Sequence, residues 1–276
     1  MAGELERVRK ALRELDKSLK SLPANPTPDA VHKLRTAARR VEAIAAVLES
    51  TEGKKSRRLV KAIEPMRKAA GGVRDMDVLA ANVRRLSRYD AGESLNRLLD
   101  HLGTVRRQNA EKLERALHHR RKGVARELKE YSRLIVSVLK RAQAGAHADD
   151  ESTQTEEEIH TAATTVLREL GEWRPLDAEN LHEFRLKVKE LRYTLQLDAN
   201  ADPGLVAALG DVQRRIGDWH DWQQLEEIAR EVLIHEEDRA LRDRIAATVI
   251  RKFDRALAAA NALRSKYLAM PATNEI

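Results

Sequence analysis

Apolar residues recur along the chain with the three- and four-residue spacing of amphipathic helices, and no stretch alternates apolar and polar residues as a half-buried strand does. The strong helix formers Ala, Leu, Arg, Glu and Lys dominate, while the 12 glycines and 7 prolines fall mostly at breaks in the pattern. Helix starts are marked by Thr27-Pro28, by Asp202-Pro203 and by a capping box of Thr155 with Glu158. The pattern predicts an all-α protein with helices over 3–21, 28–50, 54–70, 75–88, 92–121, 124–142, 154–170, 178–199, 203–216, 221–236 and 238–268.

A histidine-led basic motif occurs twice, once in each half of the chain, and the two copies are 150 residues apart. Each copy has a histidine followed by cations three and seven residues later. On an α-helix these positions lie within about 60° of one another. Each copy therefore directs one imidazole and two cations to the same side of one helix. The copies are His32, Arg35 and Arg39, and His182, Arg185 and Lys189.

The apolar stripe of each motif helix lies beside its basic face rather than opposite to it. In the second copy Arg192, ten residues after the histidine, joins the basic face, whereas the first copy has Glu42 at that position. A basic face next to the core is well placed to line a groove. The stripes are Leu34, Ala38, Val41, Ala45 and Leu48 in the first copy, and Phe184, Val188, Leu191 and Leu195 in the second.

The two halves match again about 40 residues after each histidine, where Arg74-Asp75 corresponds to His220-Asp221 and Lys68 to Arg214. The repeated order of these motifs indicates an internal duplication. We therefore expect two pseudo-symmetric antiparallel helical bundles, whose basic faces meet at a channel or groove along a shared seam.

The formal net charge of +7 conceals an asymmetry between the halves. Residues 1–141 carry 34 Lys and Arg against 18 Asp and Glu, a net charge of +16, while residues 142–276 carry 17 against 26, a net charge of −9. The small, acidic segment over 142–154 is expected to link a basic half-repeat, 1–141, to an acidic one, 155–276. A basic half of this size indicates a polyanionic partner, because net charge governs association more than fold.

Composition narrows the class of protein further. The chain has no cysteine, which excludes disulfide and thiolate chemistry and predicts a reducing compartment. The charged start MAGELERVRK carries no signal peptide, and no run approaches the roughly 18 apolar residues of a membrane span. We therefore expect a cytoplasmic protein without a membrane partner. An aromatic content of 3% leaves few side chains for stacking nucleic-acid bases.

Three segments resemble the CHAD family, the conserved histidine α-helical domains: VHKLRTAARR at 31–40, VRDMDVL at 73–79 and LHEFRLKVKELRY at 181–193. The resemblance covers nearly the whole chain and implies a single CHAD-like domain over 1–276. It further implies paired helical bundles around a basic channel that binds inorganic polyphosphate, in a protein associated with polyphosphate granules. Many members are fused to a triphosphate-tunnel hydrolase domain, but this chain has neither the strand pattern nor the ExExK motif of that domain.

Both motif helices supply candidate phosphate ligands. An imidazole donates to phosphate oxygens when neutral and adds positive charge when protonated, and the guanidinium fork holds phosphate bidentately. Glu42 opposes this charge in the first half, which raises the question of whether the halves bind equally. The predicted polyphosphate-binding residues are His32, Arg35, Arg39, Arg40, Lys61, Lys68, Arg74, His182, Arg185, Lys189, Arg192 and Arg214.

Other charged positions have structural interpretations that compete with a binding role. Lys54, Arg57, Lys61 and Lys68 form a stripe that fits a solvated helix face as well as a channel wall. The basic runs 106–107 and 120–122 fit a solvated surface at least as well as a binding role, the latter run as a helix end. His118-His119 lacks a third metal ligand at a known spacing. Asp221 with Gln224 has capping-box spacing, so helix capping is the favoured role of Asp221 and, by the repeat, of Asp75. Orientation of nearby arginines is the alternative role. Asp77 is a further anion in this basic setting.

Two other functions compete with polyphosphate binding as interpretations of the sequence. His182 with His220-Asp221, and Asp243 or Asp254 as a fourth ligand, resembles the metal set of helical HD phosphohydrolases, but the cations around His182 would repel a metal. A non-specific nucleic-acid binder satisfies the electrostatic requirement, yet no recognition-helix or RNA-binding module is present. We expect a binding protein with no catalytic residues, metal or cofactor, and with weak non-specific affinity for nucleic acid at most.

Overall fold

The computed structural model of the chain describes residues 2–47, 49–87, 92–144, 161, 163–195 and 201–268. Within these ranges every regular element is a helix and there is no strand, which confirms the all-α prediction. None of the helices in these ranges has a stretch that is both long and apolar enough to cross a membrane. The chain divides into two compact units, Met1–His147 and Ala148–Ile276, called unit 1 and unit 2 below.

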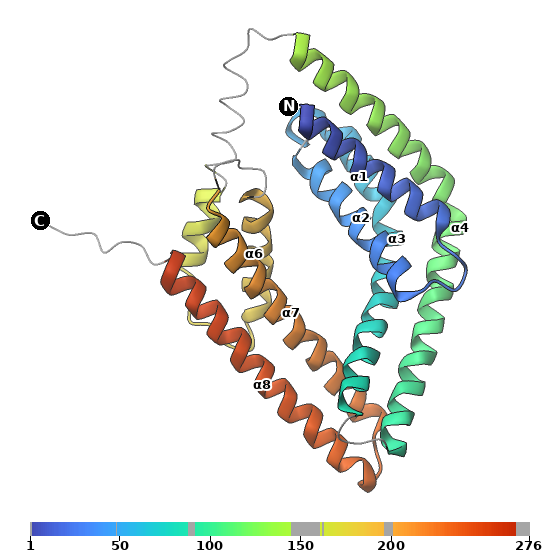
Figure 1. The fold of residues 1–276 in the computed structure, drawn as a ribbon, viewed down its shortest axis with the longest axis vertical. Coiled ribbons are helices and arrows are strands. Elements are labelled where there is room, and N and C mark those ends of the chain that lie inside the picture. The colour runs from blue at the N-terminus through green and yellow to red at the C-terminus, as the bar shows by residue number, and fades with distance from the viewer. Residues whose placement is uncertain are drawn as a thin grey trace, which may run out of the picture. The chain divides into compact units, whose positions relative to one another are not determined.

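Unit 1 consists of long helices (Figure 1). Their side chains form one core at one end of the unit. Leucine, valine and alanine side chains from α1, α2, the first part of α3 and the last part of α4 interlock around Leu15, Val31, Ile63 and Tyr131. Beyond this core, α3 and α4 continue side by side as an antiparallel hairpin. The helices are α1 (Ala2–Ser21), α2 (Pro28–Val47), α3 (Glu49–Leu86) and α4 (Glu93–Ala144).

Unit 2 has a corresponding order of elements. A helix over 163–171 precedes α6, and the α6 stripe packs on the first part of α7 and the last part of α8 around Phe184, Ile216 and Trp219. The last part of α7 and the first part of α8 form a second long antiparallel hairpin (Figure 1). The elements are α6 (Leu181–Leu195), α7 (Pro203–Val232), a 3₁₀ turn η1 (Glu236–Asp238), α8 (Arg239–Leu263) and a π turn η2 (Arg264–Leu268).

Three predicted helix breaks were wrong, because α3, α4 and α7 each run through what the sequence divided in two. A glycine inside a helix costs only about 1 kcal/mol, which a long packed helix tolerates. At two of the breaks the glycine admits a side chain of the neighbouring helix: Arg35 lies against Gly71, and Arg185 lies against Gly217. At Gly123, where α4 continues, nothing approaches within 4 Å of an added Cβ.

The predicted helix starts at Thr27 and Asp202 are confirmed. The Ala30 amide donates to Thr27 Oγ1 at 3.2 Å, and the Gly204 amide donates to Asp202 Oδ1 at 2.8 Å. The helix α6 begins at Leu181 rather than 178, because Asp177 Oδ1 accepts the amides of Glu179 and Asn180 and closes a turn there.

The Thr155–Glu158 capping box, Leu48 and most of the expected linker lie outside the described residues, and 142–144 belong to α4. The internal duplication and the channel at a seam stay predictions.

Candidate anion-binding faces

In unit 1, α2 carries the first basic motif on the side that turns toward α3. The stripe residues Leu34, Ala38, Val41 and Ala45 are buried, as predicted. His32 is exposed, whereas Arg35 and Arg39 are half-buried at the edge of the core. The residues His32, Arg35 and Arg39 of α2 together with Arg74 of α3 are called face 1.

Arg35 is the centre of face 1. It lies so close to α3 that a Cβ added to Gly71 would stand 2.5 Å from its Nη1 atom. Burial is the largest cause that lowers the pKa of Arg35, and the charge of Arg39 is the next; Asp75 acts in the opposite direction. The charges of Arg67 and Arg74 lower it further. Cations held this close repel one another, so the positive potential at face 1 is high and would attract an anion.

In unit 2, α6 carries the second motif, and His182 of α6 meets His220 of α7 with ring centroids 5.1 Å apart. Arg185 donates from Nε to the Gln213 carbonyl oxygen at 3.2 Å, and its guanidinium lies against Gly217, where an added Cβ would be 3.3 Å from Nη2. Lys189 places its ammonium 5.6 Å from the ring centre of Tyr193. The residues His182, Arg185, Lys189 and Arg192 of α6 together with His220 of α7 are called face 2.

Arg192 extends face 2 toward the start of α7. Its Nη1 donates to Gln213 Oε1 at 3.0 Å, and its guanidinium lies against Gly210. Arg192 and Arg214 both line an open pocket between α6 and the first turns of α7. Arg214 is ion-paired with Asp211, and Asp211 also accepts from Arg215 Nε at 2.6 Å.

Four of the predicted ligands lie outside the two faces, and one of them is Arg214, which pairs with Asp211. Arg40 pairs with Glu14 of α1 at 2.6 Å, on the side of α2 that turns toward α1. Lys68 pairs with Glu64 one turn earlier at 2.7 Å and thereby lowers the pKa of that carboxyl group. Lys61 is exposed on α3. The surroundings of these residues therefore support a phosphate-binding role less well than the surroundings of the residues in the two faces.

Glu42 does not stand free on the rim of face 1, as the sequence indicated. Arg67 of α3 donates from Nε to Glu42 Oε1 at 2.7 Å, and the side chains are only 25% and 19% exposed. Glu42→Arg would set two guanidinium groups against each other. The interpretation of Glu42 as a simple opposing charge is therefore revised.

Asp75 and Asp221 do not cap helices, because both lie in the interior of continuous helices, α3 and α7. This corrects the favoured prediction. The charge of Asp75 acts on Arg35, which fits the alternative role of orienting an arginine. The run 120–122 is likewise in the interior of α4 and not at a helix end, and its three side chains are exposed.

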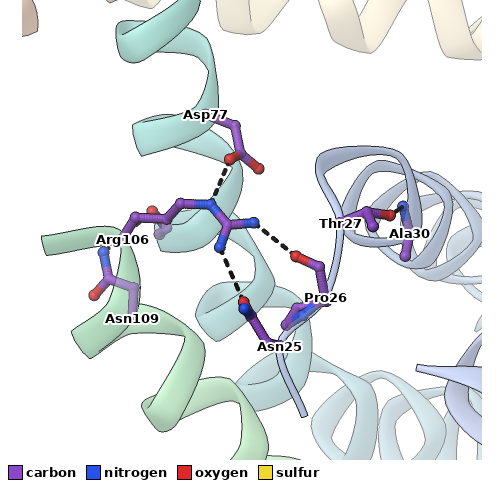
Figure 2. Close-up of polar contacts among 8 residues, drawn as sticks. Asn25, Pro26, Thr27, Ala30, Asp77, Arg106 and Asn109 are labelled. Atoms are coloured by element: carbon purple, nitrogen blue, oxygen red, sulfur yellow. Dashed lines mark hydrogen bonds and ion pairs between the residues drawn. The ribbon is translucent and has the colours of Figure 1, made fainter. Parts of the chain in front are cut away.

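Arg106 has a structural role that its place in a basic run did not reveal. Figure 2 shows its guanidinium between α3 and the segment that leads into α2. Its Nε donates to Asp77 Oδ1 at 2.6 Å, and its Nη2 donates to the Pro26 carbonyl oxygen at 2.7 Å. The Asp77 side chain is 6% exposed. This buried ion pair fixes the start of α2, and with it the register of face 1 against α3.

The sequence missed the contribution of Gln213 and of the glycines under the arginines. Gly71 and Gly217 each stand three residues before the matched pair Arg74 and His220, so their equal spacing was the available signal. Gln213 stands one residue before Arg214, as Arg67 stands one residue before Lys68. A neutral side chain opposite an arginine gives no signal in sequence.

Within the described residues, no group of three or more histidine, cysteine, aspartate or glutamate side chains is arranged to hold a metal ion. His182, His220 and Asp221 therefore do not assemble with Asp243 or Asp254 into the HD-type set. His118 and His119 contact each other edge to face, with ring centroids 5.5 Å apart.

Comparison with known proteins agrees with this architecture. Among solved structures, the chain is similar to the crystal structure of the CHAD domain from the plant Ricinus communis, with a TM-score of 0.63 and 18% identity over 96% of this chain and 90% of that chain. At this identity the similarity shows the fold alone. No curated protein sequence matches the chain. A family model described as CHAD domain matches residues 6–230, which is most of the chain, and the chain therefore belongs to the CHAD domain family.

Proposed function

We propose that this chain binds inorganic polyphosphate through face 1 and face 2 and does not alter it chemically. The observation that carries the proposal is the arrangement found in both units, where an arginine of the motif helix is held against a glycine of the next helix among further cations. Arginines fixed in this way lose little entropy when they bind a phosphate group. The same local arrangement in both units also supports our proposal that the chain arose by internal duplication.

The extent of face 2 favours a polymer over a single phosphate group. His182 and Arg192 are ten residues apart on one helix, which corresponds to about 15 Å. A linear polyanion can place successive phosphates along such a row, and each contact adds a charge-assisted hydrogen bond. ATP and short polyphosphates engage fewer of these positions, so they should bind much more weakly.

A competition titration tests the proposal against the nucleic-acid alternative. Long-chain polyphosphate, duplex DNA, single-stranded RNA and ATP would compete for the protein at about 150 mM salt, where screening reduces non-specific attraction. We expect polyphosphate to displace the nucleic acids, which retain only weak binding. Equal or tighter binding of DNA or RNA would contradict the proposal.

We further propose that the chain has no hydrolase activity. Incubation with polyphosphate or a nucleotide in the presence of Mg²⁺ or Mn²⁺ should release no phosphate. Release that His220→Ala abolishes would instead establish the HD-type alternative, in which His220 is a metal ligand.

The cellular part of the proposal is a cytoplasmic protein at polyphosphate granules. A fluorescent fusion should colocalise with granules, and Arg185→Ala with Lys189→Ala should disperse it. Colocalisation that survives in cells unable to make polyphosphate would contradict this assignment.

The histidines of face 2 make a prediction about pH. Burial, the His220 ring and the charge of Arg185, in this order, lower the pKa of His182 from its ordinary value of 6.5, and Glu183 acts in the opposite direction. In the free protein His182 is therefore neutral at pH 7. Bound polyphosphate favours the protonated ring and raises this pKa, so binding takes up protons. The affinity should increase as pH falls from the bound-state pKa to the free-state pKa.

In the protein without polyphosphate, a fall in pH has the opposite effect: it lowers stability. The folded-state pKa of His182 lies below the unfolded value, so the unfolded state binds protons more readily and the free energy of unfolding decreases as pH falls below about 6.5. Calorimetric titrations with polyphosphate between pH 8 and pH 5.5 measure the effect on affinity, and unfolding of the free protein over the same pH range measures the effect on stability, each for wild type and His182→Gln. Identical pH profiles for the two proteins would contradict the prediction.

A further inference from the structure

The two faces differ at one matched pair of positions. Ten residues after the histidine, α2 has Glu42 and α6 has Arg192, while the facing helices have Arg67 and Gln213. Arg67 donates to the Glu42 carboxylate at 2.7 Å, whereas Arg192 donates to the Gln213 amide oxygen at 3.0 Å. Both units therefore fix an arginine at this place. Within the part of the chain that the structure describes, a carboxylate pairs with this arginine in unit 1 only.

Gln213 holds two arginines of face 2 at once. Its backbone carbonyl accepts from Arg185 Nε at 3.2 Å, and its side chain accepts from Arg192 Nη1. Among the described residues, no carboxylate lies within ion-pairing distance of Arg192, and its shielded Nε atom has no hydrogen-bond partner. The nearby carboxylate of Asp211 is occupied by Arg214 and Arg215. Arg192 is thus fixed in place while its charge stays available.

Face 1 has the opposite arrangement. Arg67 is near enough to Arg35 for its charge to act on the guanidinium there. Because Glu42 pairs with Arg67, part of the positive potential around Arg35 is cancelled. A neutral amide in place of this carboxylate would keep the contact and restore the charge.

Resting on the polyphosphate-binding function proposed above, we infer that Gln213 is the positioning residue that makes face 2 the stronger polyphosphate-binding face, and that the Glu42–Arg67 pair weakens face 1. Gln213 contacts both arginines through neutral groups, and it holds Arg192 without cancelling the charge of that guanidinium. A carboxylate at the same place would hold Arg192 more firmly but would compete with phosphate for it.

Two nearly isosteric substitutions test this in the full-length protein, with long-chain polyphosphate as the probe. Gln213→Glu supplies a carboxylate to Arg192, so we expect binding to weaken about ten-fold while the melting temperature holds or rises. Glu42→Gln keeps the contact with Arg67 but no longer neutralises its charge, so we expect binding to tighten about three- to ten-fold with a small loss of stability. A purely structural role for Gln213 would not lower affinity while preserving stability.

Matched controls separate this effect from net charge. Gln108→Glu and Glu111→Gln make the same changes in charge at exposed positions of α4, and at about 150 mM salt each should change affinity less than about two-fold. If Gln213→Glu binds like Gln108→Glu, or Glu42→Gln like Glu111→Gln, the inference is wrong. If Gln213→Glu does not fold, the Glu42→Gln result alone decides. Failure of the wild type to bind polyphosphate would instead refute the proposed function.

Discussion

Replacing Arg35 and Arg39 with alanine, or Arg185 and Lys189, should weaken polyphosphate binding by about one to three orders of magnitude. A charge-assisted hydrogen bond contributes roughly 1.5–3 kcal/mol at most, and less where solvent reaches it. The fold should survive because the apolar stripes of α2 and α6 do not include these residues. In unit 1 the loss also relieves repulsion, since Arg39 and Arg67 already lower the pKa of Arg35.

Titration of each double variant with long-chain polyphosphate at several salt concentrations measures this loss, and thermal unfolding monitors the fold. Fewer ion pairs should give a shallower dependence of affinity on salt. The face 2 variant should lose more affinity, because face 2 contributes more to binding in the wild type. Arg192 keeps its charge in face 2, whereas Glu42 neutralises Arg67 beside face 1. Wild-type affinity in both variants, with binding lost on charge reversal of Lys54 and Lys61, would place the site elsewhere on α3.

The glycines under the arginines should give effects of opposite sign on stability and binding. Alanine is a better helix former than glycine by about 1 kcal/mol, so Gly71→Ala and Gly217→Ala should favour the helical state. A Cβ at these positions would stand 2.5 Å from Arg35 Nη1 and 3.3 Å from Arg185 Nη2. These atoms end flexible side chains, so the guanidinium moves rather than the helix. Polyphosphate affinity should fall about three- to thirty-fold.

Gly123→Ala is the matched control, because no atom lies within 4 Å of the added Cβ. It should raise the melting temperature without changing polyphosphate affinity. Affinities of Gly71→Ala and Gly217→Ala that equal that of Gly123→Ala would mean that the arginines are not held in their binding position by these contacts.

The sequence predicted the helices and the basic faces through periodicity. Residues at offsets of three and seven share a helix face whatever the tertiary structure, so the placement of Arg35 and Arg185 beside the buried stripe followed directly. The starts at Thr27 and Asp202 followed from local capping chemistry. Each of these features depends on residues close together in the chain.

Contacts between side chains of two different helices were not predicted from the sequence, or were predicted wrongly. Gly71 and Gly217 were interpreted as helix breaks, because the sequence does not show which side chain approaches a glycine. Glu42 was read as an opposing charge on the rim of the site, since its partner Arg67 is 25 residues away. The sequence divided α3 and α7 in two and predicted new helices to begin at 75 and 221. Asp75 and Asp221 were therefore interpreted as capping residues.

The central claim is that the placement of the cations in the two faces, and not the net charge of the protein, confers polyphosphate binding. The most direct test compares two quadruple alanine variants with the same loss of charge by titration with long-chain polyphosphate. One removes the face cations, and the other removes exposed cations of α4. The face variant carries changes at Arg35, Arg39, Arg185 and Lys189, and the control carries changes at Arg120, Arg121, Lys122 and Arg126. We predict that the face variant loses measurable binding at about 150 mM salt while the control stays within about three-fold of wild type. Equal losses in the two variants would contradict the account.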